Sequence, residues 1–189
     1  EAMIANTCED MNLCMSFFEK LGINTLSHIA FEALDKFRIA KNSMPKAWDL
    51  QDAINFVEFA TSVAADYSDY LDEKPADWKQ DGRELNFFYQ FAFQCQGVFN
   101  PICAYFGGYV AQEIVKAMTG KFTPVNQAFY YDASELLPEF SLEKHVEPNG
   151  DKDFFEKEYI TKIAKTREIG HRSDGLRICI GEDTNRKLE

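Results

Sequence analysis

The chain has 189 residues, of which 46% are hydrophobic and 27% are charged. This length suits one ordinary domain or two small ones, and the composition excludes wholesale disorder and collagen-like repeats. Twenty Lys and Arg residues against 31 Asp and Glu residues give a net charge of −11. Such a surface repels phosphate backbones, so no nucleic acid and no membrane is expected as a partner. The longest apolar run, 101–111, is also shorter than the roughly 20 residues that span a bilayer.

The first predicted helix begins near Thr25 and stops near Asn42. Its apolar residues recur at steps of three and four, which places them on one stripe that comprises Leu26, Ile29, Ala30, Ala33, Leu34 and Phe37. Asp49 or Asp52 is suited to cap a second helix, which we expect to reach about Leu71.

The second predicted helix is apolar on two sides, because Phe56, Phe59 and Val63 crowd a face next to its main stripe. A helix of this kind would expose too much apolar area in water, so we expect burial on both sides. A charged loop follows, and a third helix is predicted over 83–96. Together the three helices predict most of a small antiparallel bundle.

The predicted helix with the clearest start and stop signals runs from Pro101 to the residue before Gly120. Asn100 is suited to cap it, and Gly120 suits the left-handed position after a helix. Gly107 and Gly108 interrupt the helix at a cost of about 1 kcal/mol each relative to Ala. Such a pair is typical of a place where another backbone approaches closely, and a tolerated kink is the alternative.

Two short strands are predicted in the C-terminal part of the chain, at 127–132 and 176–180. The region 139–167 between them combines an acidic linker with the pattern of a helix or a charged arm. A last short helix is predicted to begin at Asp183 or Thr184.

The residue patterns of an active site are weak in this sequence. No glycine-rich loop follows a predicted strand, as a phosphate cradle requires, and no acidic pair stands out as a general acid and base. The cysteines are odd in number and include no CxxC pair, which favours reduced, structural thiols and no zinc site. Cys103 lies in the first turn of its helix, where the dipole favours a thiolate, but its apolar neighbours favour a buried, inert thiol.

Three stretches carry a resemblance to a known family. Residues 100–124, NPICAYFGGYVAQEIVKAMTGKFTP, continue into FYYDA at 129–133 and LLPE at 136–139. This run resembles the ubiquitin-activating enzymes, in which it is the last helix and a following strand of the inactive adenylation half. Residues 26–37, LSHIAFEALDKF, resemble the start of the four-helix bundle inserted before it, and 172–181, RSDGLRICIG, are similar to the start of the active adenylation half.

The resemblance implies a mainly α fold, with a helical bundle followed by a long helix and a few short strands from an incomplete α/β adenylation domain. The implied divisions are an unassigned segment 1–23, the bundle 24–97, part of the inactive adenylation half 98–139, a linker or insertion 140–171, and the start of the active adenylation half 172–189.

The family adenylates the C-terminus of ubiquitin with ATP and magnesium, captures it as a cysteine thioester and passes it to a conjugating enzyme. The nucleotide loop, the metal-binding acid and the catalytic cysteine would lie beyond Glu189. The resemblance therefore implies a scaffold section of an ATP-dependent enzyme that is inactive alone, with no catalytic residue, cofactor or metal ligand of its own. The implied partners are the active adenylation half and, for the whole enzyme, ubiquitin and a conjugating enzyme, in the cytoplasm and nucleus.

The resemblance and the paired glycines place the expected interface with the active half on the residues Gly107, Gly108, Gln112 and Glu113. Arg172 is a candidate contact to the degenerate nucleotide pocket, with a solvated structural role as the alternative. Ser173 stands where the family usually has Tyr, and Asn185 where it usually has Gln.

Two other functions fit the sequence. The first is a stand-alone helical interaction module, whose aromatic anchors would be Phe56, Phe59, Phe87 and Phe91. The second is an activating enzyme for another ubiquitin-like modifier.

Overall fold

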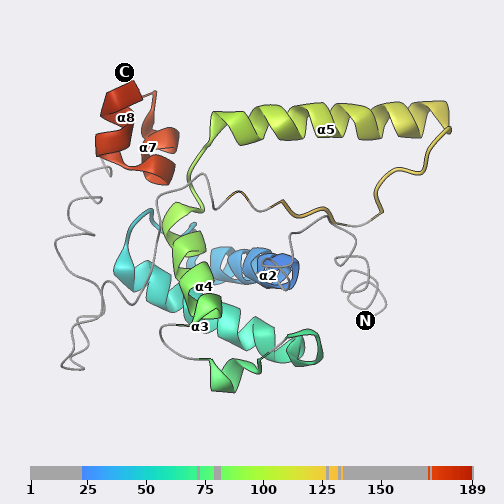
Figure 1. Ribbon diagram of the computed structural model, residues 1–189. Helices are drawn as coiled ribbons and strands as arrows, with labels where there is room; N and C mark the ends of the chain where they lie inside the picture. The colour runs from blue at the N-terminus through green and yellow to red at the C-terminus, as the bar shows by residue number, and fades with distance from the viewer. Residues whose placement is uncertain are drawn as a thin grey trace.

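The computed structural model describes residues 23–71, 73–78, 82–126, 128–131, 133, 170 and 172–188. Within these ranges the regular structure is helical and no strand is present, which confirms the mainly α fold (Figure 1). The elements are α2 (Ile23–Lys41), α3 (Leu50–Asp66), η3 (Ser68–Tyr70), η4 (Pro75–Asp77), α4 (Arg83–Gln94), α5 (Asn100–Thr119), α7 (Asp174–Ile180) and α8 (Glu182–Leu188).

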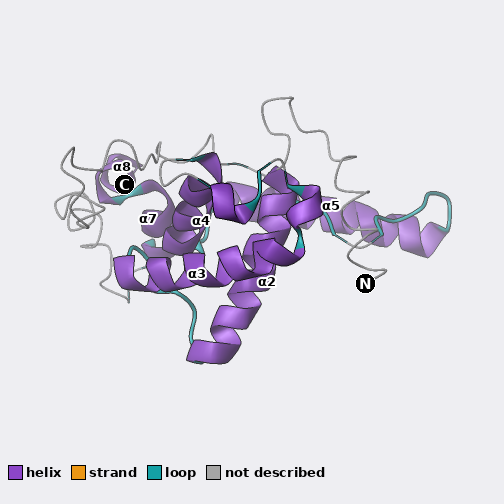
Figure 2. Cartoon of the chain, turned by 90° about the horizontal axis from the view of Figure 1, so that it is seen from below, coloured by secondary structure: helices purple, strands orange, loops and turns teal. Residues whose placement is uncertain are grey.

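The helices α2, α3 and α4 pack together around one apolar core (Figure 2). The fully buried side chains from α3 include Phe56 and Val63, and Phe59 is partly buried against the same core. Burial of α3 on two faces is therefore confirmed. The predicted stripe of α2 is confirmed as well: Leu34 is partly buried against this core, and the other residues of the stripe lie within it, namely Leu26, Ile29, Ala30, Ala33 and Phe37.

The helix boundaries follow local signals closely. Asn42 has a positive φ of 51°, a left-handed conformation suited to the residue that follows a helix, and α2 ends immediately before it. Asp49 caps α3, since its side chain accepts a hydrogen bond from the backbone N of Asp52 at 3.0 Å. However, α3 ends at Asp66 and not near Leu71, because the chain tightens into the 3₁₀ turn η3.

Helix α5 leaves the bundle as a long projecting arm, and the residues after it run back beneath it (Figure 1). Gly120 ends α5 with a left-handed φ of 60° and donates its N–H to the carbonyl of Lys116, as expected of this glycine. The expected cap is wrong by one position, since Phe99 is the cap residue and Asn100 already lies in the first turn.

The C-terminal helices α7 and α8 form a small pair that packs near the end of α4 (Figure 1). The strand predicted at 176–180 is wrong, because these residues lie in α7. Within the predicted strand 127–132, the described residues 128–131 have no strand structure. The last helix begins at Glu182, close to the predicted start.

No helix in the described ranges has both the length and the apolar character needed to cross a membrane.

Candidate functional site

The candidate site is α5, whose two long faces have different surroundings. One face packs against the return segment, which we define as residues 121–126 and 128–131, through aromatic contacts with 128–131. The rings of Tyr109 and Phe129 stack at 4.3 Å, and those of Tyr105 and Tyr131 lie 4.7 Å apart. Phe106 meets Phe129 edge-on at 6.1 Å. These contacts hold the return segment along the helix.

Glu113 adds a polar contact on the same face. Its carboxylate accepts hydrogen bonds from Lys116 Nζ and from the backbone N of Val125, both at 2.7 Å. The Lys116 bond, followed by the Val125 bond, lowers the pKa of Glu113, so the side chain is ionised at neutral pH. Glu113 was predicted to face the active half, and in the structure it binds the chain's own return segment.

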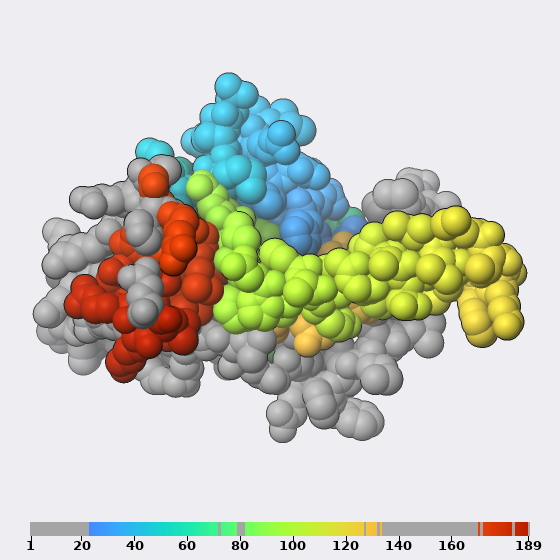
Figure 3. Space-filling model, turned by 90° about the horizontal axis from the view of Figure 1, so that it is seen from above, coloured from blue at the N-terminus to red at the C-terminus, as the bar shows by residue number. Residues whose placement is uncertain are grey.

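The opposite side of α5 is open. We define its outer face as the residues that share this side at helical spacing, namely Ala104, Gly107, Gly108, Ala111, Ile114, Val115 and Met118. All of them are exposed, and no residue of α5 is buried. Met118 has 81% of its surface exposed, and Ile114 and Val115 about half. The space-filling view shows α5 as a ridge that projects from the body of the molecule (Figure 3).

The paired glycines are the flattest part of this outer face. A Cβ atom added at Gly107 or at Gly108 would meet no described atom within 4 Å. The helix continues without a break through both glycines from Asn100 to Thr119 and runs straight in the view of Figure 1. The side chain of Gln112 is exposed at the edge of the outer face. The structure therefore places Gly107, Gly108 and Gln112 together on an open surface.

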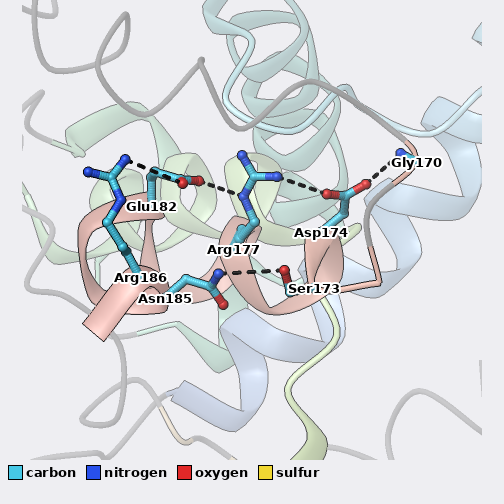
Figure 4. Close-up of polar contacts among 7 residues, drawn as sticks. All are labelled: Gly170, Ser173, Asp174, Arg177, Glu182, Asn185 and Arg186. Carbon is cyan, nitrogen blue, oxygen red and sulfur yellow. Dashed lines mark hydrogen bonds and ion pairs between the residues drawn. The ribbon is translucent and has the colours of Figure 1, made fainter. Parts of the chain in front are cut away.

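Arg172 lies elsewhere, in the exposed turn that leads into α7. A polar network follows it along the helix pair (Figure 4). Arg177 bridges Asp174 at 3.1 Å and Glu182 at 2.6 Å, and Asp174 also accepts a hydrogen bond from the backbone N of Gly170 at 2.7 Å. Sequence reasoning missed this network. Its signal is the opposite charge of Asp174 and Arg177 at a spacing of three residues, which favours a helix.

Asn185, one of the residues that departs from the family pattern, is buried between these two helices. Its side-chain Nδ2 lies 3.5 Å from Ser173 Oγ, the other departing position. Ser173 and Asn185, the two positions that differ from the expected family pattern, thus contact each other (Figure 4).

A second network ties the return segment to the bundle. His28 Nδ1 lies 2.7 Å from the hydroxyl of Tyr130, and His28 Nε2 lies 3.1 Å from the hydroxyl of Tyr67. Tyr67 in turn donates to Glu32 Oε2 at 2.7 Å. Burial lowers the pKa of His28, although the nearby carboxylate of Glu32 opposes the effect. A neutral imidazole therefore joins α2, the residue that follows α3, and the end of the return segment.

The described cysteines differ in their surroundings. Burial raises the pKa of Cys95 to about 12 and that of Cys179 to about 11, as expected of inert structural thiols. The expectation of a buried Cys103 is wrong: its side chain is exposed, because α5 projects away from the bundle. Cys8 and Cys14 lie outside the described residues. In the described ranges no cluster of three or more His, Cys, Asp or Glu side chains is arranged to hold a metal ion.

Comparison with known proteins connects this architecture to one family. Residues 3–64 match the family described as the ubiquitin-activating enzyme E1 four-helix bundle. This stretch belongs to that family. It includes most of the segment 1–23 that the sequence pattern left unassigned, and α2 and most of α3 lie in its described part.

Relatives extend the similarity beyond the bundle. The chain is 40% identical to "Ubiquitin-activating enzyme E1 1" of Triticum aestivum over 129 residues, which are 68% of this chain and 12% of the wheat protein. It is 37% identical to "Ubiquitin-activating enzyme E1 1" of Arabidopsis thaliana over 65% of this chain and 11% of that protein. It is 32% identical to "Ubiquitin-like modifier-activating enzyme 1" of Mus musculus over 92% of this chain and 14% of that protein.

These matches confirm the resemblance to the ubiquitin-activating enzymes. The chain spans about one eighth of the length of the E1 relatives that it matches.

Proposed function

We propose that this chain is the non-catalytic scaffold section of a ubiquitin-activating enzyme and that the outer face of α5 docks the active adenylation half. The whole enzyme would adenylate ubiquitin with ATP and magnesium, form a cysteine thioester and transfer ubiquitin to a conjugating enzyme. The role of the E1 bundle and α5 would be to hold the active half in the geometry that adenylation requires, since catalytic groups act only when a rigid shell positions them.

The observation that carries this proposal is the exposure of one complete face of α5. Small and apolar residues at helical spacing are typical of a face that packs against another element, and contiguous exposed apolar surface marks an interaction site. The open glycines allow the backbone of the partner to approach more closely than any other residue would permit. The chain spans 12% of its wheat relative, so a relative of that length holds many further residues. This favours a partner that is another part of the same enzyme.

The stand-alone interaction module is less well supported. Its proposed anchors lie in or against the bundle core: Phe56 is fully buried, and Phe59, Phe87 and Phe91 are partly buried against that core. Side chains already packed in this way are poorly placed to bind a partner. The other alternative, activation of another ubiquitin-like modifier, draws on the printed name of the mouse relative. Running the ATP–pyrophosphate exchange assay described below with ubiquitin and with other ubiquitin-like modifiers distinguishes activation of ubiquitin from activation of another modifier.

The test uses Gly108→Leu in the full-length enzyme, with ATP–pyrophosphate exchange as the measurement. Leu favours a helix more than Gly by roughly 0.8 kcal/mol, and a Cβ atom at Gly108 would meet nothing within 4 Å, so the variant should fold normally. We expect the exchange rate to fall at least about tenfold, because Leu blocks the close approach of the active half. Ala40→Leu, at an exposed position near the end of α2, is the matched control and should leave the rate unchanged. Normal exchange by Gly108→Leu would contradict the proposal.

A further inference from the structure

The C-terminal end of α7 is capped by the bundle and not only by its own chain. The last carbonyls of a helix lack intrahelical partners and need hydrogen-bond donors from elsewhere. The carbonyl of Arg177 receives the N–H of Gly181 at 2.8 Å, which is a local cap. The next two carbonyls take donors from distant residues: Ile178 accepts from Trp48 Nε1 at 2.9 Å, and Cys179 accepts from Gln94 Nε2 at 3.3 Å.

Trp48 is held in an unusual backbone conformation at this position. Its φ is 54°, in the left-handed region that residues with a side chain rarely adopt. The side chain is 4% exposed, and its ring stacks on Phe93 at 5.1 Å with an interplanar angle of 9°. The backbone N of Trp48 also donates to the carbonyl of Phe93 at 3.3 Å. Surrounding contacts therefore fix the indole with its N–H directed at α7.

The backbone just after α4 meets α7 at close range. Val98 donates its N–H to the carbonyl of Gly175 at 2.9 Å, and a Cβ atom at Gly175 would lie 2.8 Å from Val98 Cβ. A Cβ atom at Gly97 would clash with Cys179 Sγ. The bundle thus contacts α7 through two side-chain donors, one backbone donor and two glycines that permit close packing.

We propose that Trp48 and Gln94 are positioning residues that cap α7 and thereby fix the α7–α8 pair, with the turn that carries Arg172, against the E1 bundle. The cap rests on hydrogen bonds within this chain. Its consequence for adenylation rests on the proposed function, in which α7 belongs to the start of the active half. The bundle would then set the position of the active half at two places, namely the outer face of α5 and the end of α7.

The test measures amide hydrogen exchange of the 189-residue chain by mass spectrometry. Trp48→Phe keeps an aromatic ring against Phe93 but removes the N–H donor, and Gln94→Met keeps the length of the side chain but removes its amide. Loss of one hydrogen bond corresponds to about a fivefold change in a local opening equilibrium. We expect each variant to exchange the α7 amides about fivefold faster than the parent.

Two further variants separate capping from general damage. Gln94→Lys restores a donor of similar reach and should return α7 exchange to nearly the parent rate. Trp78→Phe is the matched control, because Trp78 Nε1 donates to the carbonyl of Glu73 at 3.2 Å, away from α7. It should leave α7 exchange unchanged.

Unchanged α7 exchange in both capping variants would overturn the proposal, as would equal acceleration by Trp78→Phe or a failure of Gln94→Lys to restore protection. If Trp48→Phe accelerates exchange throughout α2, α3 and α4, Gln94→Met decides. Acceleration confined to α7 supports the cap, and either no acceleration or equal acceleration throughout the bundle overturns it. The experiment needs no partner protein. Its failure is therefore distinguishable from failure of the docking proposal, which concerns α5.

Discussion

Asp49 shows how a single residue sets where a helix of the E1 bundle begins. Its backbone is extended, with φ −100° and ψ 116°, while its carbonyl already accepts from the backbone N of Ala53 at 3.0 Å. Its carboxylate accepts the backbone N–H of Asp52, one of the donors that the first turn leaves without an intrahelical partner. Asp52 in turn accepts from the backbone N of Lys46 at 3.0 Å, which fixes the connection before α3.

We predict that Asp49→Ala lowers the free energy of unfolding by about 1 kcal/mol, the usual cost of losing such a cap. Urea denaturation followed by circular dichroism measures this change. Asp35→Ala, at an exposed position of α2, serves as the control and should stay within about 0.5 kcal/mol of the parent. Equal stability of the two variants would show that the Asp49 carboxylate does not cap α3.

His28 gives the stability a pH dependence of known sign. Because burial lowers its pKa in the folded state below the ordinary value of 6.5, the unfolded chain binds the proton more readily. The contribution of His28 to the free energy of unfolding is therefore complete above about pH 7.5. It is lost as the pH falls through 6.5 toward the pKa of His28 in the folded chain. Burial alone would raise the pKa of Glu32, but the hydrogen bonds from Tyr67 and Lys36 lower it below its ordinary 4.5, so Glu32 stays ionised above about pH 5.5.

We predict that the free energy of unfolding of the parent chain decreases between pH 7.5 and 5.5 and that His28→Gln reduces this decrease. Urea titrations at four pH values in that interval measure the slope for both proteins. Subtracting the variant from the parent removes contributions from His145 and His171, which His28→Gln leaves in place. An identical slope in the two proteins would contradict the assigned role of His28.

Among the elements, α5 shows its described contacts with the return segment on one face, where aromatic rings are joined by the hydrogen bond of Glu113. The stack of Tyr109 on Phe129 is the closest of the described ring contacts along this helix, at 4.3 Å. Without it, the return segment would keep the hydrogen bond from Val125 to Glu113 and weaker ring contacts. The aromatic face thus determines how firmly the return segment follows α5.

Tyr109→Ala should therefore loosen the return segment. We predict several-fold faster tryptic cleavage after Lys121, which lies between α5 and the aromatic contacts, with the products identified by mass spectrometry. Val110→Ala alters the next residue, which is about half exposed, and is expected to leave the cleavage rate near that of the parent. Similar cleavage rates in both variants would show that the stack does not hold the segment.

The elements also show what sequence patterns are able to predict. The limits of α2 and α5 were close to the predicted ones because their signals are local: apolar stripes, a proline in the first turn and a left-handed glycine. The residues 176–180 were predicted as a strand because a short apolar run is compatible with both structures. In the structure these residues form α7, whose last carbonyls accept hydrogen bonds from Trp48 and Gln94. These donors lie 130 and 85 positions away in the sequence from the carbonyls that they bind.

For the molecule as a whole, local sequence signals reach only part of the candidate site. The paired glycines pointed to α5, and the structure shows open space beside both of them, while their role as an interface stays a prediction. The role of Glu113 and the exposure of Cys103 were not predictable, since both depend on the return segment and on the direction in which α5 leaves the bundle. The cap of α7 also lacks a local signal, because its donors belong to distant elements.

Docking of the active adenylation half on the outer face of α5 is best tested by a binding measurement. Isothermal titration compares the 189-residue chain, Gly108→Leu and the control Ala40→Leu, each with a separately produced active half. We expect binding by the parent and by Ala40→Leu, and at least about tenfold weaker binding by Gly108→Leu. Absence of binding by the parent chain, or equal affinity of all three proteins, would contradict it.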